Sequence, residues 1–303
     1  MNSRRRIAAG SRSYRQAAVA ALIVTLLAGT AAADPLTWRF YADSRYGQLH
    51  VHAARPAGRA ASPPLVLFHQ TPLSARMYST ILPLLAERRV VYAVDTPGYG
   101  ESDPPPAPVA IEDYAAAVGD FLDTLPPAVD VLGYHTGVLI ATELALTRPE
   151  QVRRVVLVAV PLFDAEQRAA YQARETEYAE DGSHLLDMWN STLKVRPEGQ
   201  TLAQAARIVA EKQRAGLRAW WAGPAIFGYD LETALPRLTQ PVLVMRPNDG
   251  LWEHTGKAAA LIGRVTLDER PDWAYGLFDA HAGDIAAAVL TFIDGADEPG
   301  QEQ

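Results

Sequence analysis

The sequence predicts an α/β fold, in which a doubly wound, mostly parallel β-sheet carries helices on both faces and an inserted helical cap. Three observations support this prediction. From Trp38 onward, short apolar runs alternate with segments of helical spacing, as in a parallel sheet covered on both sides. Turn-forming residues follow these runs where strands of such a sheet would end. The alternation stops after Leu162, and it resumes only near Pro241.

The expected strands are short. Residues 49–53 alternate polar and apolar side chains, which is typical of a strand at the edge of a sheet. Continuous apolar runs suit strands buried on both faces, and we expect four of these at residues 64–68, 90–94, 129–132 and 155–160. The sheet is expected to resume at residues 241–245 and to continue near residues 264–267.

The expected helices lie between these strands. Residues 111–125 have apolar side chains at helical spacing, and Glu112 and Asp113 fall in the first turn, where acidic groups favour the helix dipole. Helices are also expected at residues 138–146 and, at the end of the fold, at residues 285–293.

The long stretch without strands is expected to form the cap. Residues 165–179 and 202–220 have helical spacing, and no β-rich run separates them. We therefore expect an α/β core made of residues 34–163 and 228–303. Residues 164–227 would form a helical insertion in that core.

The first 33 residues indicate an export signal. They contain five arginines and no acidic residue, an apolar run at residues 17–29, and the small residues Ala31, Ala32 and Ala33 before Asp34. We expect cleavage near Ala33 and a periplasmic or secreted mature protein. The alternative is an uncleaved membrane anchor, for which the apolar run is short, because a span needs about 20 residues. Both the general secretory and the twin-arginine routes stay open.

The charge of the mature chain excludes some partners. Removing the five arginines of residues 1–33 from 28 basic residues leaves 23 against 35 acidic ones, a net charge of −12. Such a surface repels phosphate backbones and anionic lipids, so we expect no nucleic-acid partner and no membrane binding after cleavage. The absence of cysteine excludes disulfides, thiol nucleophiles and cysteine metal ligands. The sequence leaves the oligomeric state open.

Three motifs stand at the ends of expected strands. They are His69-Gln70-Thr71-Pro72, the run from Asp95 to Ser102 (Asp-Thr-Pro-Gly-Tyr-Gly-Glu-Ser), and Gly133-Tyr134-His135-Thr136-Gly137. In this order they resemble the α/β-hydrolase superfamily, whose corresponding motifs are His-Gly-x-Pro, Asp-x-x-Gly-x-Gly-x-Ser and Gly-x-Ser-x-Gly. The resemblance covers nearly all of the mature chain. It implies the α/β-hydrolase fold and hydrolytic chemistry on a small-molecule substrate.

The third motif departs from that family at its central position. A residue on a sharp strand-to-helix turn exposes its side chain above the sheet, and flanking glycines avoid collisions with the neighbouring strand or helix. Here the exposed residue is His135 where the family has serine. An imidazole with a pKa of ~6.5 exchanges a proton near neutral pH. It does not form the family's acyl-serine.

The resemblance also implies an oxyanion hole. Its backbone N–H donors correspond to Thr71 and Thr136, and backbone donors survive the replacement of side chains. Gln70 replaces the family's glycine and places a bulky polar side chain near the pocket, beside His69.

Of the other two triad positions of the family, this sequence keeps the acid and replaces the histidine. Asp249 follows the strand expected at residues 241–245, where the resemblance places the triad acid. An Asn-Asp-Gly turn is the alternative explanation of that residue. The triad histidine corresponds to Gly276, and His281 lies five residues later. A shifted loop would bring His281 inward, while the alternative is a histidine that flanks the last helix. A smaller residue at 276 would leave room for His135 to approach Asp249.

No metal or cofactor is expected. His50 and His52 share one face of the first expected strand, and a solvated strand face explains them better than a metal site. His69, His135 and Asp249 lie on loops that could converge on a metal, but their spacing does not require one.

The leading hypothesis is an exported hydrolase-like enzyme acting on a small ester or lactone. His135 would serve as the base, Asp249 would orient it, and Thr71 and Thr136 would supply the oxyanion donors. Cofactor-free C–C bond lysis is an alternative within the same fold. A binding protein that has kept the pocket without the chemistry is the alternative from another class.

Overall fold

The computed structural model describes residues 34–295, except for positions 172, 174, 176 and 199. The expected export signal therefore lies outside the described residues. Every helix in the described part of the chain is too short or too polar to cross a bilayer.

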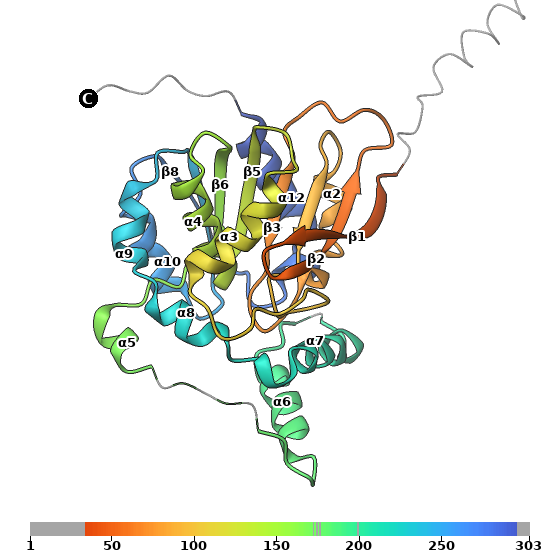
Figure 1. The fold of residues 1–303 in the computed structure, drawn as a ribbon, viewed down its shortest axis with the longest axis vertical. Helices are drawn as coiled ribbons and strands as arrows, with labels where there is room; N and C mark the ends of the chain where they lie inside the picture. The colour runs from red at the N-terminus through yellow and green to blue at the C-terminus, as the bar shows by residue number, and fades with distance from the viewer. Residues whose placement is uncertain (1–33, 172, 174, 176, 199, 296–303) are drawn as a thin grey trace, which may run out of the picture. The chain divides into compact units, whose positions relative to one another are not determined.

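The core of the fold is an eight-stranded sheet with the strand order β1-β2-β4-β3-β5-β6-β7-β8 (Figure 1). β1 and β2 pair antiparallel, as do β2 and β4, and all other neighbours pair parallel. The predicted mostly parallel sheet is thus confirmed. The strands are β1 (Leu36–Ser44), β2 (Gly47–Arg55), β3 (Leu65–Phe68), β4 (Val91–Val94), β5 (Val129–Tyr134), β6 (Val152–Val158), β7 (Val242–Pro247) and β8 (Val265–Arg270).

The prediction of the edge strand was wrong. The expected edge strand corresponds to β2, which lies between β1 and β4, and β1 forms the edge. β1 was not predicted, although Leu36, Trp38, Phe40 and Ala42 alternate along one face, and most of its side chains are exposed, as at the edge of a sheet. Its place is fixed by a nine-residue antiparallel register with β2 across a tight turn.

Helices cover both faces of the sheet, as expected for a doubly wound fold. One apolar cluster contains residues of α3 (Ile111–Leu122), α4 (Thr136–Thr147) and α10 (Trp252–Ala259). The other contains residues of α2 (Leu82–Leu85), α11 (Leu277–Ala280) and α12 (Ala282–Asp294). Successive residues of the central strands enter opposite clusters, which explains why these strands are apolar throughout.

The segment between β6 and β7 is helical, and its outer helices gather at one end of the sheet (Figure 1). It contains α5 (Ala165–Ala169), α6 (Ser183–Lys194), α7 (Leu202–Arg214), the 3₁₀ turn η2 (Gly216–Arg218) and α8 (Ala222–Gly228), followed by α9 (Leu231–Ala234) and η3 (Leu235–Arg237). A further 3₁₀ turn, η1 (Ala75–Tyr78), follows β3 in the core.

Two helices of this segment are shorter than predicted. The helix expected over residues 165–179 ends at Ala169, and no side chain of α5 is buried, so it lacks the packing that sustains helices. The helix expected over residues 202–220 ends at Arg214. Gly216 follows with a φ of +56°, which an α-helix does not accommodate.

Candidate active site

The turn between β5 and α4 has the geometry of a nucleophile elbow. His135 occupies it with φ 50° and ψ −113°, a backbone conformation that residues other than glycine rarely adopt. A Cβ at Gly133 would lie 2.6 Å from the amide nitrogen of Val138, and a Cβ at Gly137 would lie 2.6 Å from the carbonyl carbon of Phe68. Both glycines are therefore required by the close approach of β5, α4 and β3.

The side chain exposed by this turn meets Asp249. His135 Nε2 lies 2.7 Å from Asp249 Oδ2, and 19% of the His135 side chain is exposed, whereas that of Asp249 is fully buried. An ionised carboxylate only accepts hydrogen bonds, so Nε2 carries the proton. His135 Nδ1 has no hydrogen-bond partner among the described residues, and it is left as a basic nitrogen.

Tyr134 is a site residue that the sequence did not reveal. Its hydroxyl donates to Asp249 Oδ2 over 3.1 Å, and the N–H of Leu251 donates to Asp249 Oδ1 over 3.2 Å. Burial, followed by the charge of Asp249, raises the pKa of Tyr134 well above its usual value, so the phenol stays protonated. The sequence signal that could have revealed Tyr134 is its place at the end of a buried strand, because a buried tyrosine hydroxyl needs a hydrogen-bond partner.

Gly276 does not make room for His135. It has a φ of +81° and begins α11, and the heavy atoms nearest to an added Cβ belong to Gln200, at 2.9 Å, and Pro197, at 3.4 Å. The space is therefore filled by the cap, contrary to the size exchange that the sequence suggested. The neighbouring Tyr275 lies closer to the site, with its ring centre 6.2 Å from that of His135.

His281 is not brought to the His135–Asp249 pair. It lies at the junction of α11 and α12, and its ring stacks on Trp273 with centres 4.9 Å apart. It makes no hydrogen bond or ion pair with His135 or Asp249 in the described part of the chain. The geometry matches the alternative of a helix-flanking histidine.

The two expected oxyanion residues meet each other. Thr71 Oγ1 and Thr136 Oγ1 lie 2.9 Å apart, and the N–H of Thr71 donates to Thr136 Oγ1 over 3.4 Å. This long bond is weak. A substrate oxygen would take the place of the Thr136 hydroxyl at the Thr71 N–H, near the positive N-terminus of α4.

The remaining histidines considered as ligands have structural contacts. His69 is fully buried, and burial lowers its pKa. Its Nε2 accepts from the N–H of Thr96 over 3.0 Å, so its Nδ1 donates to the carbonyl of Gln70 over 2.8 Å. No three His, Asp or Glu residues of the described chain gather as a metal site would require.

The expectation of a solvated strand face at His50 was wrong. His50 is 4% exposed, and its Nδ1 lies 2.9 Å from Asp95 Oδ2. Its ring centre is 4.8 Å from that of His52, so the two do share one face. That face is covered because η1 and α2 pack against β2 and the turn after β4 brings Asp95 to His50.

Comparisons with known proteins agree with this fold. The family model described as the alpha/beta hydrolase fold matches residues 63–205. A pimeloyl-[acyl-carrier protein] methyl ester esterase of Klebsiella pneumoniae is 39% identical over 195 residues, which cover 59% of this chain and 72% of that protein. The chain belongs to the α/β-hydrolase fold family.

Another relative and two solved structures of the same fold match this α/β-hydrolase chain over more of its length. The esterase of the same name from Xylella fastidiosa M12 is 26% identical over 246 residues, 76% of this chain and 95% of that one. A hydrolase structure from Pseudomonas aeruginosa PA01 aligns with a TM-score of 0.67 at 24% identity, over 89% of this chain and all of that one. The enol-lactonase of Burkholderia xenovorans LB400 aligns with a TM-score of 0.66 at 19% identity, over 84% of this chain and all of that one.

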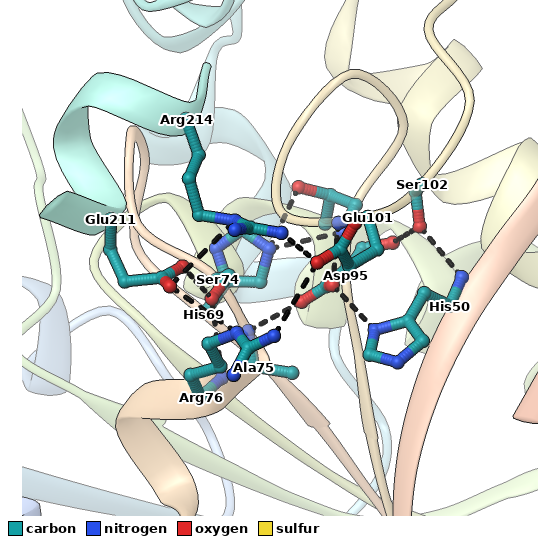
Figure 2. A network of polar contacts seen from close by, with 11 residues as sticks. His50, His69, Ser74, Ala75, Arg76, Asp95, Glu101, Ser102, Glu211 and Arg214 are labelled. Carbon is teal, nitrogen blue, oxygen red and sulfur yellow. Dashed lines mark hydrogen bonds and ion pairs between the residues drawn. The ribbon is translucent and has the colours of Figure 1, made fainter. Parts of the chain in front are cut away.

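The cap of this α/β hydrolase is anchored to the core by a charged network (Figure 2). Glu211 of α7 accepts from Ser74 Oγ over 2.6 Å and pairs with Arg76 Nε at 3.2 Å. Arg214, one turn later, pairs with Glu101. Glu101 lies in the turn after β4, where Asp95 Oδ1 accepts from the N–H of Ala75 over 2.6 Å. The Asp95 turn, η1 and α7 are thereby joined.

A cavity of about 320 Å³ lies between the cap and the core, and its wall adjoins the His135–Asp249 pair without including either residue. Tyr134 and Tyr275, which neighbour His135, form part of its wall with Gln70 and Gly276. Its volume is in the range of small-molecule sites. The further lining residues are Leu73, Met77, Thr192, Val195, Arg196, Pro197, Gln200, Ile208, Lys212, Phe278 and Asp279.

Proposed function

We propose that this α/β hydrolase is an exported enzyme that hydrolyses a small ester or lactone with His135 as general base. The observation that carries the proposal is the 2.7 Å contact between His135 Nε2 and the buried Asp249, because in the neutral ring it places the proton on Nε2 and makes Nδ1 the acceptor at the exposed elbow. The relatives named as methyl ester esterases support the ester class.

The chemistry requires no covalent intermediate. His135 Nδ1 takes a proton from a water molecule as the water oxygen bonds to the substrate carbonyl carbon. Asp249 stabilises the resulting imidazolium, and the N–H groups of Thr71 and Thr136 stabilise the oxyanion. The imidazolium then returns its proton to the leaving alcohol oxygen as the C–O bond breaks, and an acid and an alcohol result.

Tyr134 serves this cycle as a positioning residue. Its hydroxyl and the N–H of Leu251 hold the Asp249 carboxylate from two sides, so that the carboxylate faces Nε2. A fixed carboxylate keeps the imidazole in the tautomer whose Nδ1 accepts a proton.

The deciding experiment is a panel of esters and lactones, carrier-linked esters included, assayed with wild type, His135→Ala, His135→Ser and His281→Ala. We expect His135→Ala to lose at least about 100-fold in kcat/KM, the usual contribution of a general base. His135→Ser should also be inactive, because Gly276 supplies no base. The matched control His281→Ala should keep wild-type activity. Unchanged activity in His135→Ala refutes the proposal, and activity gained in His135→Ser points to His281 as the base.

One observation favours a second candidate, a ligand-binding protein without catalysis. The Thr136 hydroxyl covers the N–H of Thr71, where a reacting carbonyl oxygen would bind. Such a protein would bind ester or acid ligands in the cavity without turning them over. Replacing Thr136 by alanine distinguishes the two, since it frees the Thr71 N–H and is expected to raise turnover in an enzyme and to create none in a binding protein.

Export is the localisation we propose for this enzyme, on the basis of residues 1–33. Expression of the full chain in a Gram-negative host should place the protein in the periplasm. N-terminal sequencing should find a new terminus near Asp34. A cytoplasmic product that keeps residues 1–33 contradicts export.

A further inference from the structure

The cap places in the wall of the cavity a lysine that pairs with no acidic side chain of the described residues. Lys212 lies near the end of α7, and its Nζ lies 3.0 Å from Thr192 Oγ1 of α6. Thr192 Oγ1 donates its own proton to the carbonyl of Met188 over 2.8 Å, so it accepts from the lysine. An ammonium has three donors, and this contact uses one.

No acidic residue in the described part of the chain neutralises the charge of Lys212. No carboxylate of the described chain lies within ion-pair distance of its Nζ. Burial lowers the pKa of Lys212, and no acidic neighbour offsets this effect. A partly desolvated cation without a counter-ion costs free energy, and an anionic ligand would recover it.

The neighbouring charges on the same helix behave differently. Glu211 and Arg214 are both paired in the network that joins α7 to the core (Figure 2). That network fixes the rotation of α7, so Lys212 and Ile208 are the side chains that this helix presents to the cavity. The unpaired lysine is therefore held in place by paired neighbours.

The rest of the cavity wall is complementary to an aliphatic carboxylate, because it combines apolar side chains with a second cation. Its wall includes the apolar side chains of Leu73, Met77 and Phe278. Arg196 adds a second cation, whose Nη1 donates to the carbonyl of Gln200 over 2.8 Å and which has no carboxylate partner among the described residues. The lining acid, Asp279, is engaged by the hydroxyl of Thr80 at 2.6 Å.

We propose that Lys212, with Arg196, binds the carboxylate of an aliphatic acid in this cavity, so that the substrate carries an anionic group at the end remote from the reacting ester. The identity of the reacting end rests on the proposed function. The anion site does not, because it follows from Lys212 and the cavity alone. The substrate class is then an ester or lactone of an aliphatic acid that bears a second, free carboxylate.

The test compares octanoate with octanamide, which has the same chain and no charge, by isothermal titration calorimetry. Wild type should bind octanoate at least about tenfold more tightly, the effect of one hydrogen bond to a charged group. Lys212→Met should lower this ratio severalfold, the double variant Lys212→Met/Arg196→Met should bring it close to one, and Lys212→Arg should preserve most of it. Lys194→Met, which removes an exposed lysine from the same cap, is the matched control and should behave as wild type.

Two results overturn the anion site: equal binding of octanoate and octanamide by wild type, or a preference for octanoate that Lys212→Met leaves unchanged. Neither depends on turnover. If octanoate is preferred and no ester is hydrolysed, the proposed hydrolysis fails and the anion site stands. If esters are hydrolysed, the p-nitrophenyl monoester of a dicarboxylic acid should show a KM about tenfold higher in Lys212→Met, while its methyl-capped analogue should show no change.

Discussion

Gly137→Ala tests the packing that forms the elbow. The added Cβ would lie 2.6 Å from the carbonyl carbon of Phe68, 3.0 Å from its Cβ, and in hard overlap with its carbonyl oxygen. These are mainly backbone atoms of β3, which is hydrogen-bonded on both sides by β4 and β5. Relief of the overlap therefore requires a shift of α4 or of a central strand.

The expected loss of stability follows from the cost of overpacking a core, and a second glycine provides the control. Overpacking of a well-packed core costs about 1–3 kcal/mol, and overlap with a fixed backbone belongs at the upper end, so we expect a loss of about 3 kcal/mol or more. Gly283 is also the second residue of its helix, and nothing lies within 4 Å of the Cβ that alanine would add there. Gly283→Ala should stabilise the protein by about 0.5–1 kcal/mol, the difference in helix propensity.

The assay is urea denaturation followed by far-ultraviolet circular dichroism, with wild type and the two variants side by side. The same chemical change at equivalent helix positions is expected to give opposite signs. If Gly137→Ala stays within about 1 kcal/mol of wild type at an unchanged m-value, the close approach of α4 to β3 is refuted. The same variant should lose ester hydrolysis, because His135 is held by the turn that would move.

Three further predictions concern the site, the cap and the sheet. Tyr134→Phe removes one hydrogen-bond donor from buried Asp249, so it should lower the free energy of unfolding by about 1–2 kcal/mol and kcat severalfold at unchanged KM. Wild-type values of both would contradict the positioning role of Tyr134. Glu211→Gln breaks the pair with Arg76, so trypsin should cleave the cap faster at an unchanged urea midpoint, and equal cleavage rates would show that the network does not anchor α7. Burial lowers the pKa of His52 to about 4 in the folded protein, so the unfolded chain binds a proton at a higher pH than the folded chain does. The free energy of unfolding should therefore fall as the pH drops from 6.5 to 4, by about 1–2 kcal/mol for a partly buried group. His52→Gln should remove that part of the slope, and an unchanged slope would contradict it.

The elbow was predictable because its constraints are local. Two glycines around one exposed residue, directly after a buried strand, allow only a sharp strand-to-helix turn, and the observed φ of His135 fits it. The acidic position at Asp249 was predicted from the resemblance to the α/β-hydrolase superfamily, which places the triad acid after the strand at residues 241–245. The structure agrees, because the carboxyl ends of β5, β6 and β7 lie at one edge of the sheet and bring Asp249 to His135.

Other features of the site depend on contacts that leave no local signal. Tyr134 points to Asp249 from a position that any residue could occupy, and the volume at Gly276 is filled by Gln200 from the cap. The unpaired state of Lys212 becomes visible only once α6 and α7 are packed, because a lysine in sequence does not show whether an acid will lie beside it.

The sequence by itself determined the α/β fold and the histidine at the elbow, because turn geometry and strand apolarity depend on residues close together in the chain. The tertiary structure alone decided which groups complete the site. It placed the Tyr134 hydroxyl on Asp249, filled the space at Gly276 with Gln200, and set a cation without a described counter-ion in the cavity wall. These outcomes depend on the distances between elements far apart in sequence, and folding fixes those distances only when the cap and the sheet pack together.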